Sequence, residues 1–114
     1  KMGKTFFVIK KQLKESLEEK YSIKKIMIAY EPVWSIGTGK LPKPQELKKI
    51  FKFIISETKK ILKVKKDLIV LYGGSVNEKN VKLFSSILEI DGFLIGGASQ
   101  SSKKFVDIIK NYYK

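Results

Sequence analysis

Glu31 is the residue of this sequence best placed to act as a proton-transferring group. It follows the short apolar run at 26–30 and precedes Pro32 and a loop that contains Gly37 and Gly39. A carboxylate at the carboxyl end of a buried parallel strand lies where barrel active sites are found. Partial burial there would raise its pKa toward values useful for a general base. The alternative is that Glu31 is only a solvated residue at the end of a strand, beside an ordinary surface loop.

Two Gly-Gly turns could bind an anion. Gly73-Gly74-Ser75 follows the apolar run at 68–72, and Gly96-Gly97 follows the run at 92–95. Paired glycines let the backbone approach a ligand closely and present N–H groups to it. Each turn alone is equally compatible with an ordinary reversal of the chain. Two such units in succession fit the phosphate sites of barrels, which typically use the loops after the seventh and eighth strands.

An alternation of helices and strands must position these groups. Periodic apolar residues predict helices within 3–20, 44–62, 77–88 and 101–113, and the three apolar runs predict strands buried in a sheet. Asn77 and Ser101 or Ser102 are expected to cap helices. Such alternation predicts an α/β fold with three parallel strands. Because three strands cannot close a barrel, we expect apolar side chains and unpaired backbone groups at both edges.

The apolar sides of the outer helices can also be specified. The first is expected to bury a stripe of Val8, Ile9, Leu13 and Leu17, and the last a side that holds Phe105, Val106, Ile109 and Tyr113.

Composition narrows the classes of function. The chain has 114 residues, a formal charge of +13, no Cys and no His, so it has neither a thiol nor an imidazole for catalysis or metal binding. No apolar run has the roughly 20 residues of a membrane span. The charge makes nucleic-acid binding an alternative, but every basic residue is Lys, whereas Arg makes the commonest specific base contacts.

Four ordered blocks of sequence resemble triosephosphate isomerase: AYEPVWSIGTGK, YGGSV, DGFLIGGAS and FVDII. The resemblance extends over nearly the whole chain. It implies that residues 1–114 are the C-terminal part of a single TIM (β/α)8-barrel domain, roughly from strand 6 to helix 8. It also implies a cytoplasmic homodimeric enzyme of glycolysis and gluconeogenesis that uses no cofactor or metal. Nucleic acid and membrane are not implied partners.

The same resemblance assigns roles to individual residues. Glu31 matches the base that moves a proton between C1 and C2 of a triose phosphate, and Tyr72 matches the residue that latches the closed lid. Four residues match the groups that bind the substrate phosphate: Gly37, Ser75, Gly96 and Gly97. The remaining residues of the mobile lid are Trp34, Ser35, Ile36, Thr38, Gly39 and Lys40.

The family's catalytic Lys and His have no counterpart in this sequence, so we expect little or no isomerase activity from the chain alone. One alternative is another phosphate-handling barrel enzyme, which would not require Glu-Pro-Val-Trp before a Gly-Thr-Gly lid. A second is a non-catalytic half-barrel, or relic, that binds a phosphate or a partner protein.

Overall fold

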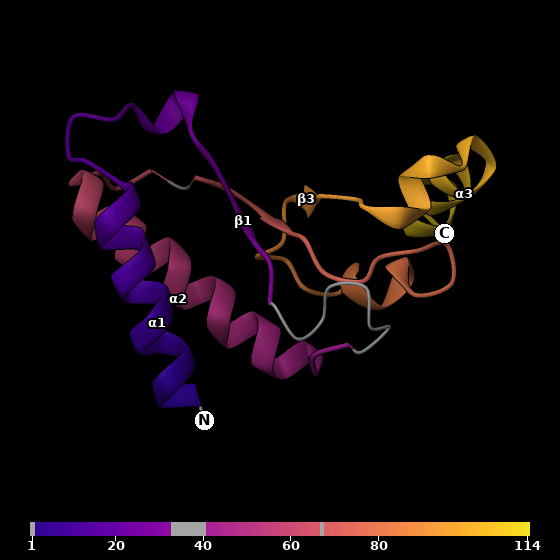
Figure 1. The fold of residues 1–114 in the computed structure, drawn as a ribbon, viewed down its shortest axis with the longest axis horizontal. Helices are drawn as coiled ribbons and strands as arrows, with labels where there is room; N and C mark the ends of the chain where they lie inside the picture. The colour runs from indigo at the N-terminus through magenta and orange to yellow at the C-terminus, as the bar shows by residue number, and fades with distance from the viewer. Residues whose placement is uncertain (1, 33–40, 67) are drawn as a thin grey trace.

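The computed structural model describes residues 2–32, 41–66 and 68–114, which form a parallel sheet with helices beside it (Figure 1). The elements in chain order are α1 (Met2–Ser16), η1 (Ile23–Lys25), β1 (Met27–Tyr30), α2 (Pro44–Leu62), β2 (Ile69–Tyr72), η3 (Val81–Phe84), β3 (Gly92–Phe93), η4 (Gly97–Gln100) and α3 (Ser102–Tyr112). The elements labelled η are short 3-10 helices. The described strands lie in the order β1-β2-β3, and both pairs are parallel. The predicted α/β fold class is therefore confirmed.

The register of the sheet brings the three strand ends to one edge. Tyr72 of β2 pairs with Tyr30 of β1 on one side and with Phe93 of β3 on the other. The pairing continues beyond the strands, because the Gly73 N–H donates to the Tyr30 carbonyl at 2.8 Å and the Leu94 N–H donates to the Tyr72 carbonyl at 2.9 Å. The loops that follow the three strands therefore start side by side.

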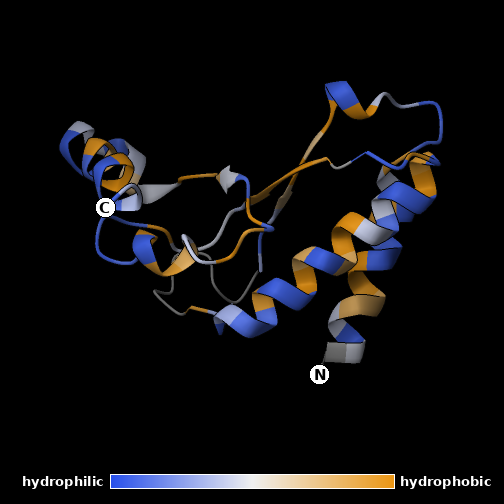
Figure 2. Ribbon diagram, turned by 180° about the vertical axis from the view of Figure 1, so that it is seen from behind, coloured by the Kyte–Doolittle hydropathy of each residue, from blue (hydrophilic) through white to orange (hydrophobic). Residues whose placement is uncertain are grey.

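Helices α1 and α2 pack together beside β1 and β2 (Figure 1). Helix α2 begins with Pro44, whose missing N–H suits a first turn, and ends where Lys63 takes a left-handed conformation with φ 53°. Its apolar residues repeat with helical spacing and are buried, and Figure 2 shows them as an orange stripe. Across the interface, the Phe6 and Phe53 rings stack with centroids 4.4 Å apart.

Three of the predicted elements need corrections of detail. Helix α1 ends at Ser16 instead of reaching residue 20, and Val8 is exposed although Ile9 and Leu13 are buried. Strand β1 is not buried on both faces, since Met27 is 65% exposed at the free edge of the sheet. The predicted helix within 77–88 is only the 3-10 helix η3. There the Asn77 side chain accepts hydrogen bonds from the N–H groups of Lys79 and Asn80, which fixes a tight turn in place of an α-helical cap.

The chain's last strand and helix also differ from expectation. Strand β3 covers only residues 92–93, and Ser101 is confirmed as the cap of α3 because its Oγ accepts from the Lys104 N–H. The predicted apolar side of α3 is largely exposed, with Tyr113 at 81% and Ile109 at 50%. Helix α3 instead buries Ile108 and places Tyr112 edge-on against Phe93. The predicted apolar side therefore borders an open groove beside β3 and is not packed against the described sheet.

Candidate active site

The described parts of the three strand-end loops meet in one cleft of about 580 Å³. Its lining includes Glu31 after β1, residues 73–79 after β2, residues 94–98 after β3, and Lys104 of α3. Of the predicted site residues, Glu31, Ser75, Gly96 and Gly97 thus border the same space. The cleft exists because the sheet register aligns the carboxyl ends of the strands.

The Glu31 side chain lies directly against the backbone of Gly73. A Cβ atom on residue 73 would be only 2.5 Å from Cγ of Glu31 and 3.1 Å from its Cδ. No ordinary Cβ contact is that short, so the carboxylate can take this position only because residue 73 is glycine. The hydrogen bond from the Gly73 N–H to the Tyr30 carbonyl holds the two segments at this separation.

Glu31 is more accessible than the sequence predicted. The side chain is exposed among the described residues, although Pro32 directly after it is buried. The described residues therefore do not provide the partial burial that was predicted for the Glu31 carboxylate. All of the residues expected to form the lid, 34–40, lie outside the described residues, and Gly37 is one of them.

A network of asparagines shapes the loop that carries Ser75. The Asn80 side chain donates from Nδ2 to the Ser75 carbonyl at 2.8 Å, and its Oδ1 accepts from the Asn77 N–H at 2.9 Å. These bonds fix the peptide of Ser75 at the cleft. Asn80 was not predicted to matter from the sequence. The only feature that could have indicated it is its position three residues after Asn77, a residue type that favours turns.

The second Gly-Gly turn is open on the cleft side. A Cβ atom on Gly96 or Gly97 would meet nothing within 4 Å among the described residues. These glycines are thus not required by local packing, in contrast to Gly73. The Ser99 N–H donates to the Gly96 carbonyl at 2.9 Å and closes the short helix η4 behind the turn.

Tyr72, the predicted lid latch, is fully buried within the sheet and its ring lies 4.8 Å from that of Phe84. Its neighbour in the sheet, Tyr30, is half-buried, and burial raises the pKa of the Tyr30 hydroxyl above its ordinary value, with a further contribution from Tyr72. The lid residues that Tyr72 would latch lie outside the described residues, so the latch remains a prediction.

Comparison with known proteins identifies the family. Residues 1–112 match the family model described as triosephosphate isomerase. The chain belongs to the triosephosphate isomerase family. Among its relatives of that name, the one from Mycoplasmopsis pulmonis is 47% identical over 107 residues, which are 94% of this chain and 40% of the relative. Those from Legionella pneumophila and Dictyoglomus turgidum are each 46% identical, over 95% and 96% of this chain and 44% and 45% of theirs.

The chain thus spans less than half the length of these triosephosphate isomerases. In the described segments no helix is long and apolar enough to cross a membrane. The same segments hold no group of three or more acidic, His or Cys side chains that could bind a metal ion.

Proposed function

We propose that this chain supplies the catalytic base and the phosphate-binding loops of an enzyme that interconverts dihydroxyacetone phosphate and D-glyceraldehyde 3-phosphate. The observation that supports this most strongly is the position of Glu31 against Gly73, in a cleft that Ser75, Gly96 and Gly97 also border. The proposed reaction itself is inferred from membership of the family. The placement of this chain at roughly strand 6 to helix 8 of a cytoplasmic, homodimeric barrel enzyme is part of the proposal.

The chemistry needs one base that serves two neighbouring carbons. The Glu31 carboxylate takes a proton from C1 of dihydroxyacetone phosphate, which leaves an enediolate, and returns a proton to C2 to give the aldehyde. The carbon skeleton and the phosphate ester stay intact, so the reaction is a redistribution of protons. The phosphate, bound by Gly37, Ser75, Gly96 and Gly97, fixes C1 and C2 within reach of Glu31 and supplies binding energy for closure of the lid at 34–40.

The enediolate oxygens need stabilising groups that this chain lacks, since it contains no His. The structure also has an open groove beside each edge strand of the described sheet. One of about 440 Å³ runs between α1 and the free edge of β1, and one of about 380 Å³ runs between β3 and the exposed side of α3. We infer that the remainder of a barrel covers both grooves and brings the Lys and His to Glu31.

The test is a comparison of Glu31→Gln with wild type in an enzyme that includes this chain and the rest of the barrel. The amide cannot accept the proton, so turnover should fall by about 10²- to 10⁴-fold, the usual contribution of a general base. Glu15→Gln is the matched control, because Glu15 is an exposed residue of α1 outside the cleft. Equal activity of the two variants would refute the role of Glu31.

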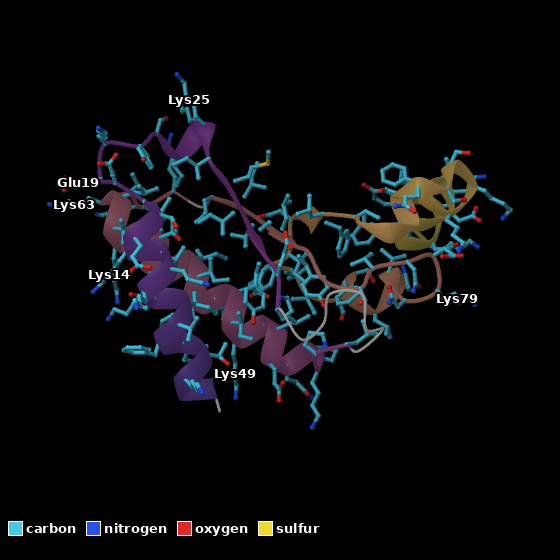
Figure 3. All side chains as sticks on the ribbon, in the orientation of Figure 1. Lys14, Glu19, Lys25, Lys49, Lys63 and Lys79 are labelled. Atoms are coloured by element: carbon cyan, nitrogen blue, oxygen red, sulfur yellow. The ribbon has the colours of Figure 1, made fainter. Side chains whose placement is uncertain are left out.

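A second candidate function is non-catalytic phosphate binding by the chain alone. The absence of His favours it over catalysis by the chain alone, and the presence of both Gly-Gly loops at one cleft favours it over the nucleic-acid alternative. The lysines labelled in Figure 3 lie apart from one another and do not form one patch: Lys14, Lys25, Lys49, Lys63 and Lys79. We expect the isolated chain to show no isomerase turnover, and normal turnover without added protein would contradict this.

A further inference from the structure

Two cations and two carboxylates border the described part of the cleft. The cations are Lys79 and Lys104, and the carboxylates are Glu31 and Glu78. Lys79 projects from the outer edge of the molecule in Figure 3. Lys104 instead belongs to the first turn of α3, which begins only a few residues after the Gly96-Gly97 turn.

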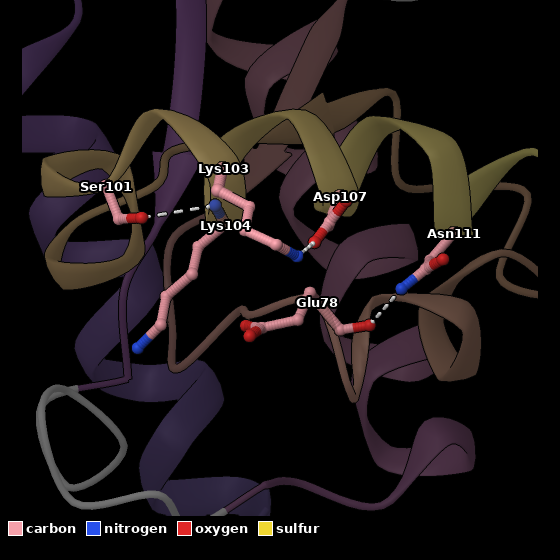
Figure 4. A network of polar contacts seen from close by, with 6 residues as sticks. All are labelled: Glu78, Ser101, Lys103, Lys104, Asp107 and Asn111. Atoms are coloured by element: carbon pink, nitrogen blue, oxygen red, sulfur yellow. Dashed lines mark hydrogen bonds and ion pairs between the residues drawn. The ribbon is translucent and has the colours of Figure 1, made fainter.

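Lys103 and Lys104 are adjacent but have different surroundings. The Lys103 Nζ donates to Asp107 Oδ2 at 2.8 Å, and the Glu78 carboxylate adds a smaller attraction to the same ammonium group. No ion pair of Lys104 is found with any residue that the structure describes. Figure 4 shows the Lys104 side chain extending away from α3, into the space where the Glu78 carboxylate also lies.

Hydrogen bonds at both ends of α3 hold the helix, and with it Lys104, in place. At the start of the helix, Ser101 Oγ accepts from the Lys104 N–H at 3.3 Å. Near its end, the Asn111 side chain donates to the Glu78 carbonyl at 2.6 Å and ties α3 to the loop that follows β2 (Figure 4). The backbone of Lys104 is therefore held beside the cleft, while its side chain remains exposed.

Helix stability does not explain a lysine at this position. The first turn of α3 contains no acidic residue, although the partial positive charge at a helix N-terminus favours acidic side chains and disfavours lysine there. Asp107 offsets the charge of Lys103. Lys104 has no such offset in the described part of the chain, so its charge suits an anion that enters the cleft.

We propose that Lys104 contacts the substrate phosphate and adds a side-chain charge to the backbone amides of Gly96 and Gly97. The inference rests on the proposed function, because the anion is taken to be the phosphate of a triose phosphate. Glu78 lies in the same space and opposes the binding of an anion. Removal of the Lys104 charge should thus weaken phosphate binding, and removal of the Glu78 charge should strengthen it.

The experiment titrates the full 114-residue chain with inorganic phosphate and follows the amide resonances of Gly96 and Gly97 by NMR. Lys104→Ala should raise the dissociation constant about two- to five-fold, the range for an exposed charge pair, and should weaken its dependence on salt. Lys103→Ala is the matched control, since it removes the same charge from the same helical turn outside the cleft. Lys104→Gln, which keeps the polar side chain, should behave like Lys104→Ala if charge is the cause.

The outcomes separate this inference from the proposed function. The contact is supported if the wild-type chain binds phosphate saturably and only the Lys104 variants bind it more weakly. It is supported further if Glu78→Gln binds phosphate more tightly. Saturable binding with equal effects of the Lys103 and Lys104 variants overturns the role of Lys104 and leaves the Gly-Gly loops as the phosphate site. A wild-type chain with no saturable shift at Gly96 or Gly97 overturns the inference together with the phosphate site of the proposed function.

Discussion

The Glu31 side chain lies so close to Gly73 that a single added methyl group on residue 73 would be 2.5 Å from Cγ of Glu31. The contact joins the loop after β1 to the loop after β2, and the hydrogen bond from the Gly73 N–H to the Tyr30 carbonyl fixes it. Gly73 thus positions the proposed base, whereas Ser75 of the same loop is the residue proposed to bind the phosphate.

Gly73→Ala should displace Glu31 without removing its carboxylate. A shift of the reacting group by about 1 Å can cost about 10²-fold in turnover, and we expect a loss of that order in an enzyme that includes this chain. The Michaelis constant should change less than the turnover number. Gly3→Ala is the control, because a Cβ on Gly3 meets nothing within 4 Å among the described residues. A fully active Gly73→Ala enzyme would show that Glu31 does not need this position.

The interface between α1 and α2 offers a test of buried charge. The Glu57 side chain is only 9% exposed, and Lys60 and Lys10 lie 3.2 and 3.9 Å from its carboxylate, whereas both lysines are at least half exposed. Replacement of both lysines by Ala leaves a buried carboxylate without a cation and should cost about 1–3 kcal/mol of unfolding free energy. Denaturant unfolding measures the loss.

The additional change Glu57→Gln should restore part of this loss, because the neutral amide is cheaper to bury than a carboxylate. Glu57→Gln in the wild-type chain should cost less than the double lysine replacement. The opposite order would mean that the ion pairs, and not the burial of the carboxylate, determine the energetics of this interface.

A second buried polar group in α2 should be dispensable. Thr58 is fully buried, and its Oγ1 has no hydrogen-bond partner among the described residues. Thr58→Val removes the unsatisfied hydroxyl at nearly constant volume and should stabilise the chain by about 1 kcal/mol. Thr58→Ser keeps the hydroxyl, loses a methyl group and should destabilise by about 1 kcal/mol. Destabilisation by Thr58→Val would reveal a partner for the hydroxyl.

Alkaline pH should weaken the sheet through Tyr30, the last residue of β1. Burial raises the pKa of Tyr30 in the folded chain, so folding favours the neutral phenol. This contribution is complete below the unfolded-state pKa of about 10 and is lost as the pH rises through the folded-state pKa. Between pH 9 and pH 12, the unfolding free energy of Tyr30→Phe should therefore fall less than that of wild type. Urea unfolding at each pH measures this difference. Identical pH dependence of both proteins would exclude Tyr30 as the cause.

The sequence predicted the strands and the site loops because local signals mark both. Residues 68–72 and 92–95 are apolar runs that end in glycine pairs, and the sheet register then brings their loops beside Glu31. Family resemblance, not periodicity, is the basis for proposing Glu31 as a base. The contact with Gly73 could not be predicted, since it depends on the separation of two strands that are far apart in sequence.

Two of the errors arose at apolar surfaces that no described element covers. The side of α3 that holds Phe105 and Ile109 has the spacing of a buried face, yet it is exposed in the structure. Met27 at the edge of β1 is exposed for the same reason. The place of Lys104 beside the cleft was not predicted, because a lysine in a helix resembles the other exposed lysines until the loops are positioned.

Proton exchange with solvent tests the central claim, that Glu31 is the base. The enzyme that includes this chain would convert D-glyceraldehyde 3-phosphate in D2O, and NMR would measure deuterium at C1 of the dihydroxyacetone phosphate formed. We predict deuterium at C1 for wild type, because the proton that Glu31 takes from C2 exchanges with solvent before one is returned to C1. Glu31→Gln should lose product and label together. Labelled product formed by Glu31→Gln at the wild-type rate would contradict the account.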